Sequence, residues 1–242
     1  MSVVLNPTAR FSVLSLPGSL GSVGRWAREI FETKSMDEKC EKVKLMHAHY
    51  FSGRLEVSGE PESLPDYPGR PEQIHPPGTR TSMKGTAPML HGICHAESYA
   101  VDLFLDLLAR FGNEDSELPK EFYDDFMEVC LQEAKHFTVW KQRLSELGVE
   151  YGSLPAHDGL WRAAYETRGD LLARLAVINM VHEARGLDTY PLSRKKLVNG
   201  KNQIRHPSIP PPYTPPPLTM PPFVLISTGH RICGHSRQQL QV

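Results

Sequence analysis

Four residues of this sequence have the types and spacing of a metal-binding site: Glu97, Glu133, His136 and Glu183. Glu133 and His136 form a Glu-x-x-His pair, which a helix places on nearly the same face. Carboxylates bridge and neutralise hard cations and imidazole adds a borderline donor, so the set suits iron or manganese, including a dinuclear site. The pair alone is a weak signal, because a solvated Glu beside a core His gives the same pattern.

Each glutamate lies within the apolar stripe of a predicted long helix, over residues 89–111, 120–147 and 168–187. An isolated carboxylate in a buried face costs several kcal/mol or takes up a proton. One such residue per helix therefore indicates a shared, charge-compensated centre. For Glu183 the alternative is an ion pair with Arg174 or Arg185. In the third helix the predicted stripe is Leu171, Leu172, Leu175, Ala176 and Met180.

The first two helices are predicted to pack as an antiparallel hairpin. Glu97 lies 18 residues before residue 115, the midpoint of the connecting loop, and Glu133 lies 18 residues after it. The two carboxylates should therefore face each other at one level. Of the nearby histidines, His91, His95 and His182 are expected to surround the ligands or lie on the surface, rather than bind metal.

Shorter elements surround these helices. Residues 23–33 predict an amphipathic helix, and Ser35 with Glu38 forms a capping box that opens a second one. Asp158 is expected to cap a short helix ending at Glu166, and Thr167 to open the third long helix in a capping box with Asp170. No strand pattern competes, so the fold class is all-α.

Breaker residues divide the chain. Seven prolines in 53–88 predict an irregular strap, and nine between Pro207 and Pro222 exclude helix and central strand there. The predicted organisation is a helical arm (1–52), the strap (53–88), a helical core (89–200) and a proline-rich tail (201–242).

Composition limits the function classes. The net charge of -1 argues against a broad nucleic-acid or anionic-membrane surface, and no apolar run approaches the length of a membrane-spanning helix. Four cysteines without CxxC spacing are typical of reduced thiols, which favours the cytoplasm, with a mitochondrial presequence as the alternative.

Several sequence blocks resemble a known family. They are Met-Leu-His-Gly-Ile-Cys-His-Ala-Glu (89–97), Glu-Ala-Lys-His-Phe (133–137), Tyr-Gly-Ser-Leu-Pro-Ala-His-Asp-Gly-Leu-Trp (151–161) and Glu-Ala-Arg-Gly-Leu-Asp (183–188). Over residues 20–200 the chain resembles a ferritin-like family of unknown function that is distantly similar to di-iron hydroxylases acting on tRNA. The resemblance implies a four-helix bundle with Glu97, Glu133, His136 and Glu183 at metal-ligand positions.

The family pattern continues into a fourth core helix with a second Glu-x-x-His, which does not occur here after residue 136. Three long core helices are therefore expected, with the proline-rich tail in place of the fourth, as an alternative C-terminus would produce. The first functional reading is a di-iron carboxylate oxidase or hydroxylase, impaired in this chain by the missing ligands. The alternative is a non-catalytic interaction protein or truncated isoform with a vestigial site, from which metal has been lost and whose exposed apolar stripes a protein partner covers.

Overall fold

The computed structural model describes residues 21–57, 63–70, 75, 79, 81–112, 118–182, 184–186, 188 and 191. Regular structure in these ranges is helical, with one isolated bridge between Ser22 and Glu56, so the predicted all-α class is confirmed. No helix in these ranges is both long and apolar enough to cross a membrane. Glu183 and the predicted tail (201–242) lie outside the described residues.

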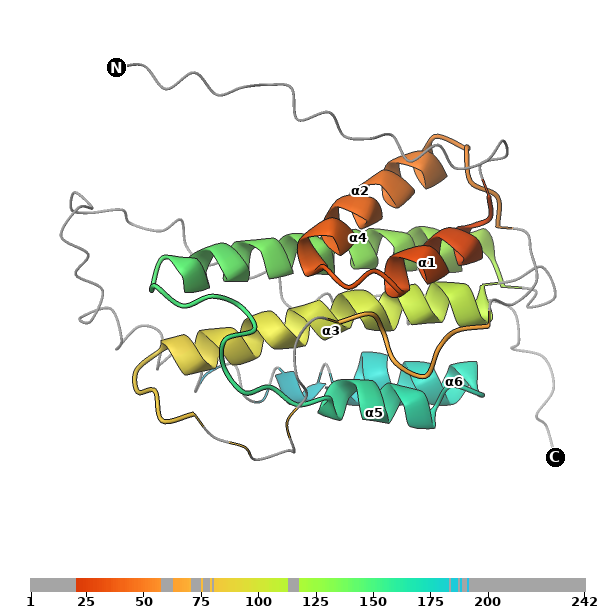
Figure 1. Cartoon of the computed structure of the whole chain (residues 1–242). Coiled ribbons are helices and arrows are strands. Elements are labelled where there is room, and N and C mark those ends of the chain that lie inside the picture. Colours follow the sequence, from red (N-terminus) through yellow and green to blue (C-terminus); the bar gives the residue numbers. More distant parts are fainter. Residues whose placement is uncertain are drawn as a thin grey trace, which may run out of the picture.

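Two long antiparallel helices, α3 (Ala87–Phe111) and α4 (Lys120–Ser145), form the centre of the molecule (Figure 1). Both were predicted, with small differences at their ends. Helix α3 begins before Met89 and includes Pro88, which the sequence analysis assigned to the strap. Proline is tolerated in a first helical turn because that turn has no use for its missing N–H. Helix α4 is followed by Gly148, whose φ of 72° few other residues adopt readily.

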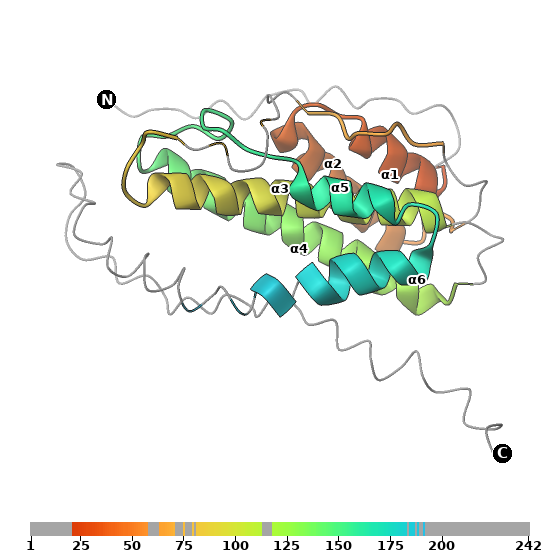
Figure 2. The same cartoon turned by 90° about the horizontal axis from the view of Figure 1, so that it is seen from below.

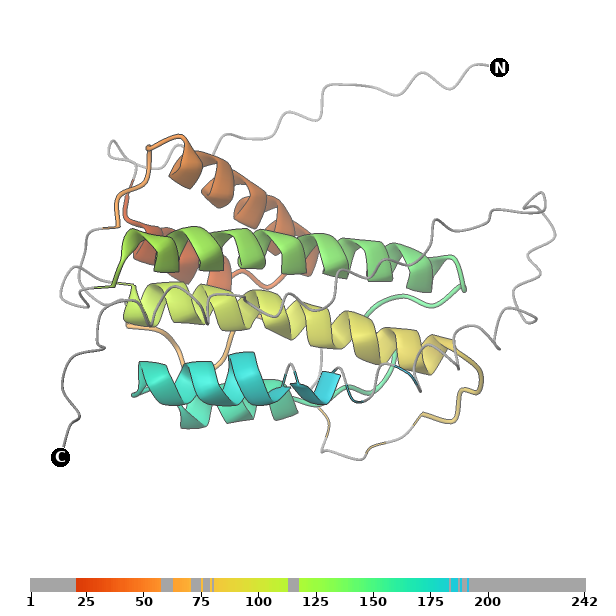
Figure 3. The same cartoon turned by 180° about the vertical axis from the view of Figure 1, so that it is seen from behind.

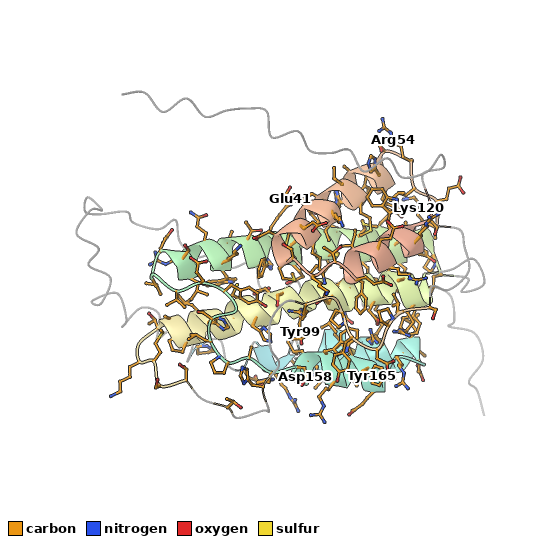
Figure 4. The ribbon with its side chains drawn as sticks, in the orientation of Figure 1. Glu41, Arg54, Tyr99, Lys120, Asp158 and Tyr165 are labelled. Carbon is orange, nitrogen blue, oxygen red and sulfur yellow. The ribbon has the colours of Figure 1, made fainter. Side chains whose placement is uncertain are left out.

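Helices α1 (Val23–Phe31) and α2 (Met36–Phe51) cover one side of this hairpin, α1 against α3 and α2 against α4. Ser35 caps α2 as predicted, accepting a hydrogen bond from the Glu38 backbone N–H. The Glu38 carboxylate pairs with Lys42 at 2.7 Å. At the other end of α2, the labelled Lys120 at the start of α4 lies over the ring of Tyr50 (Figure 4).

On the opposite side, α5 (Gly159–Glu166) lies along α3 (Figure 2). Helix α6 (Leu171–Arg174) then runs directly into a π-helix, η2 (Leu175–His182). Seen from behind, this continuous segment lies in front of α5, and η2 is in contact with α5 (Figure 3). The short helix after Asp158 is therefore confirmed, although the Asp158 side chain forms no capping hydrogen bond.

The predicted start of the third long helix was wrong. Thr167 ends α5, where its hydroxyl bonds the carbonyls of Ala163 and Ala164. Asp170 is the N-cap of α6, because its backbone is extended and its carboxylate accepts from the Ala173 N–H at 3.0 Å. A single Asp cap thus replaces the predicted capping box.

The apolar stripe predicted for that helix was also wrong in part. Leu172 and Met180 are 77% and 69% exposed, whereas Arg174 and Ile178 are buried. The cause is Arg174, which pairs with Asp106 and is buried, so the buried face contains Arg174 and Ile178, four residues apart, and Leu172 and Met180 lie on the other side of the helix. The described part of this helix consequently presents large apolar side chains to solvent.

Segment 63–70 connects α1, on one side of the α3–α4 hairpin, with α5 on the other side. The Gly69 N–H donates to the Phe31 carbonyl at the end of α1, and Trp161 of α5 donates to the Asp66 carbonyl at 2.8 Å. A Cβ at Gly69 would lie 2.1 Å from the Glu32 carbonyl oxygen, so this close approach requires glycine.

Beneath this segment, three charged side chains are buried together. Asp102 of α3 accepts from both Lys39 of α2 and Arg70, and the Lys39 and Asp102 side chains are fully buried. Lys39 also donates to the carbonyls of Phe31 and Gly69. One carboxylate therefore joins α2, α3 and segment 63–70.

We expect Asp102→Asn to lower the free energy of unfolding by about 3–5 kcal/mol, because two buried cations lose their counter-charge. Urea unfolding followed by circular dichroism measures this. The matched control is Asp37→Asn, since Asp37 pairs with Lys141 at 2.7 Å but is 67% exposed. The control should cost about 1 kcal/mol or less. Equal losses in the two variants would contradict the importance of the buried pair.

Candidate metal centre

Glu97 lies in the middle of α3, on the face that packs against α4. Cys94 and Val101, about one turn away on either side, are fully buried, and Glu97 itself is 3% exposed. The helix continues without interruption through these residues, so the apolar packing of its neighbours fixes the carboxylate in the core.

Helix α4 supplies the facing groups. Glu133 is 7% exposed and lies between the buried residues Cys130 and Phe137. His136, one turn further along, keeps 27% of its side chain exposed. The site therefore has a buried carboxylate side and a histidine side that reaches the surface.

The three side chains converge. His136 Nδ1 lies 3.4 Å from Glu133 Oε2 and 3.6 Å from Glu97 Oε2. One ligand atom from each residue falls within 4.8 Å of the others. Glu97 and Glu133 thus meet at one level of the hairpin, as their equal distance from the loop midpoint predicts.

Among the described residues, the charge around Glu97 differs from that around the other buried acids of α3. Asp102 is paired with Lys39 and Arg70. Asp106, also fully buried, is paired with Arg110 and Arg174.

Glu97 has no lysine or arginine partner in the described part of the chain, and its Oε2 forms no hydrogen bond there. Its neighbouring charged groups are a second carboxylate, Glu133, and the His136 imidazole that both acids share. In the described ranges, Asp102 and Asp106 thus have lysine or arginine partners, mostly from neighbouring elements, and Glu97 has none.

This surplus of buried negative charge is reflected in the pKa values of Glu133 and His136. Burial raises the pKa of Glu133 to about 8, with a further increase from Glu97 and an opposing effect of His136. The Glu133 carboxylate at 3.4 Å and the Glu97 carboxylate at 3.6 Å raise the pKa of His136 to about 10 against the effect of burial. Near neutral pH the cluster therefore retains protons that both groups would lose in water.

The donor set fits a divalent metal ion. Two carboxylates and an imidazole suit iron or manganese, and a positive ion would give the buried Glu97 Oε2 the partner it lacks. With bonds of about 2.1 Å, two ligands of one ion lie roughly 3–4.2 Å apart. The two distances from His136 Nδ1 fall in that range.

The other predicted residues are placed as follows. Glu183 lies outside the described residues. His91 and His95 are buried on a different face of α3, where they hydrogen-bond the segment after α4. His182 ends η2, and burial, assisted by Arg185, lowers its pKa. Arg174, considered above as a partner of Glu183, pairs with Asp106.

Sequence reasoning missed Asp102 and Asp106 as buried acids. Their signal was available: with Ser98 they recur every four residues on one face of α3. Because this face of α3 is polar, the sequence alone suggests that it is exposed to solvent. The structure shows that Lys39, Arg70 and Arg174 cover it.

The fold and the cluster define an all-α protein with a buried Glu–Glu–His site. The chain belongs to the family described as protein of unknown function (DUF455), whose pattern matches residues 32–206. An uncharacterized protein of Haemophilus influenzae is 32% identical over 185 residues, which cover 71% of this chain and 64% of that protein. The chain thus spans less than two thirds of that relative's length. No solved structure gives a significant match.

The protonation of the cluster makes a prediction for the metal-free protein. Glu133 has a folded pKa above its ordinary value of 4.5, so its contribution to stability is present at low pH and lost as pH rises towards 8. The pKa of His136 is also raised by folding, so its contribution to stability is likewise lost as pH rises, between about pH 6.5 and 10. In EDTA, the urea midpoint should therefore fall between pH 5 and 9, and Glu133→Gln should flatten this decline.

Glu128→Gln is the control for this measurement. Glu128 lies on the same helix and also contacts a histidine, His47, but that contact lowers its pKa. The control should keep the decline of the unsubstituted chain. Parallel pH profiles for the unsubstituted chain and Glu133→Gln would rule out Glu133 as its source.

Proposed function

We propose that this chain binds a divalent metal ion, iron or manganese, through Glu97, Glu133 and His136 in a ferritin-like carboxylate centre. The observation that carries the proposal is the contrast on α3: Asp102 and Asp106 have buried cations, and Glu97 shares only the His136 imidazole with a second carboxylate. Glu183 is the fourth ligand in this proposal, on the evidence of its sequence block (183–188).

We further propose that the centre serves an oxidase or hydroxylase reaction. Ferrous iron bound there would supply redox chemistry towards dioxygen, with the remaining electrons taken from the oxidised substrate or an external reductant. Glu97 and Glu133 would hold the ion in the buried half of the site, and their negative charge would favour its oxidised form. In this proposal small molecules would approach from the His136 side, where 27% of that side chain is exposed.

The sequence contains no second Glu-x-x-His after residue 136. The proposed ligands from this chain are therefore better suited to one metal ion than to two. A chain that binds no metal would favour the vestigial-site alternative, in which the exposed apolar residues of α6 and η2 contact a protein partner. The buried free thiols Cys40, Cys94 and Cys130 support a reducing compartment such as the cytoplasm.

Elemental analysis of the chain loaded anaerobically with Fe²⁺ and freed of excess tests the proposal. The unsubstituted chain should retain stoichiometric iron, and Glu133→Ala should retain more than about tenfold less, because the ion loses a charged ligand. Oxygen uptake by the iron-loaded chain, followed with an oxygen electrode, tests the reaction class.

Glu128→Ala is the matched control, since it removes a glutamate beside a histidine on the exposed part of the same helix. It should retain iron as the unsubstituted chain does. Unchanged iron content in Glu133→Ala would refute the ligand assignment. Stoichiometric iron without oxygen uptake would support metal binding and refute the proposed oxidase or hydroxylase reaction.

A further inference from the structure

A second face of α3, turned away from Glu97, is polar and buried. His91, His95, Ser98 and Asp102 lie between about 100° and 160° around the helix from Glu97, given 100° per residue. The segment after α4 and segment 63–70 cover this face. Figure 4 shows Tyr99 on the same side of α3 as Asp158, which opens α5.

Tyr151, in the segment after α4, is the residue that contacts most of this face. Its hydroxyl lies 3.1 Å from His95 Nδ1 and 2.8 Å from Ser98 Oγ. Its ring stacks on the His91 ring, with centroids 5.5 Å apart. Tyr151 therefore holds two turns of α3, and Glu97 lies between His95 and Ser98 in the sequence.

The direction of these hydrogen bonds follows from their partners. His95 Nε2 must donate, because its partner is the His157 carbonyl. In the neutral ring Nδ1 is then an acceptor, and the Tyr151 hydroxyl donates to it. The Ser98 hydroxyl lies 2.7 Å from the His95 carbonyl and 2.8 Å from the Tyr151 oxygen and has one proton for the two, and Arg70 Nη1 donates to both Ser98 Oγ and the Tyr151 oxygen. The Tyr151 hydroxyl is thus used as both donor and acceptor.

The same tyrosine also contacts α4. Its ring meets the Phe137 ring edge-on, with centroids 5.1 Å apart at 85°. Phe137 directly follows His136, and its carbonyl oxygen lies 4.0 Å from Cys94 Sγ of α3. One side chain therefore touches both helices next to the residues that converge at the cluster.

We propose that Tyr151 is a positioning residue for the metal centre. By bracing α3 against α4 behind the cluster, it sets the separation between Glu97 on one helix and the Glu133–His136 pair on the other. The inference rests on the metal-binding function proposed above. Removing the hydroxyl would remove the hydrogen bond between Tyr151 and His95 and loosen this brace.

Co²⁺ is the test probe, because its visible absorption reports the number and geometry of its ligands. Tyr151→Phe, which keeps the ring, should bind Co²⁺ about tenfold more weakly, within the range found for groups that orient metal ligands. Its spectrum at saturation should differ from that of the unsubstituted chain. Tyr151→Leu, which also loses the ring contacts, should show a larger effect.

The matched control is Tyr50→Phe. Tyr50 is buried and its hydroxyl donates to Asp124 at 2.7 Å, so it links α2 to α4 away from Glu97. This variant should lose comparable stability in urea yet keep the affinity and spectrum for Co²⁺. An equal loss of Co²⁺ affinity in Tyr50→Phe would show that the effect of Tyr151→Phe comes from a general loss of stability, and would overturn the inference.

A readout without metal separates the possible failures. Alkylation of Cys94, followed by mass spectrometry, should become faster in Tyr151→Phe, and that of Cys40 in α2 should not change. If the unsubstituted chain binds no Co²⁺, the proposed function fails, and the positioning role fails with it even where Cys94 labelling shows the brace. If it binds Co²⁺ and Tyr151→Phe matches it in affinity and spectrum, only the positioning role fails.

Discussion

The burial of carboxylates on α3 is the constraint on which the rest of the structure depends. A buried carboxylate is tolerated when a cation and hydrogen bonds replace its water, and it otherwise takes up a proton. Helix α3 carries three such groups, Glu97, Asp102 and Asp106, and all are almost fully excluded from solvent.

The surrounding elements can be understood as the sources of the compensating charge. Helix α2 contributes Lys39 and segment 63–70 contributes Arg70, both to Asp102. Helix α6 contributes Arg174 to Asp106. Elements on both sides of the hairpin are thus fixed to one helix by buried ion pairs as well as by apolar contact. Such pairs are specific in position, because a shifted element would leave a charge buried alone.

The sequence predicted the helices and the convergence of Glu97, Glu133 and His136, since apolar periodicity and loop length set the level of each residue. It failed where the deciding contact came from far along the chain. Asp102 resembles a solvated residue until Lys39, 63 positions away, is placed beside it. The predicted stripe of the third helix failed for the same reason, because Arg174 resembles a surface residue until Asp106, 68 positions away, is placed beside it.

The raised pKa values and the proposed metal site have one physical origin. In the absence of metal, Glu133 and His136 retain protons because the cluster has too much negative charge for its burial. A divalent ion that displaces those two protons leaves the net charge of the cluster unchanged while supplying bonds to all three groups. Asp102 and Asp106 offer no such exchange, because fixed side chains already provide their counter-charge. The same helix therefore contains two closed ion-pair sites and one cluster whose two protons a divalent ion would replace in the proposed function.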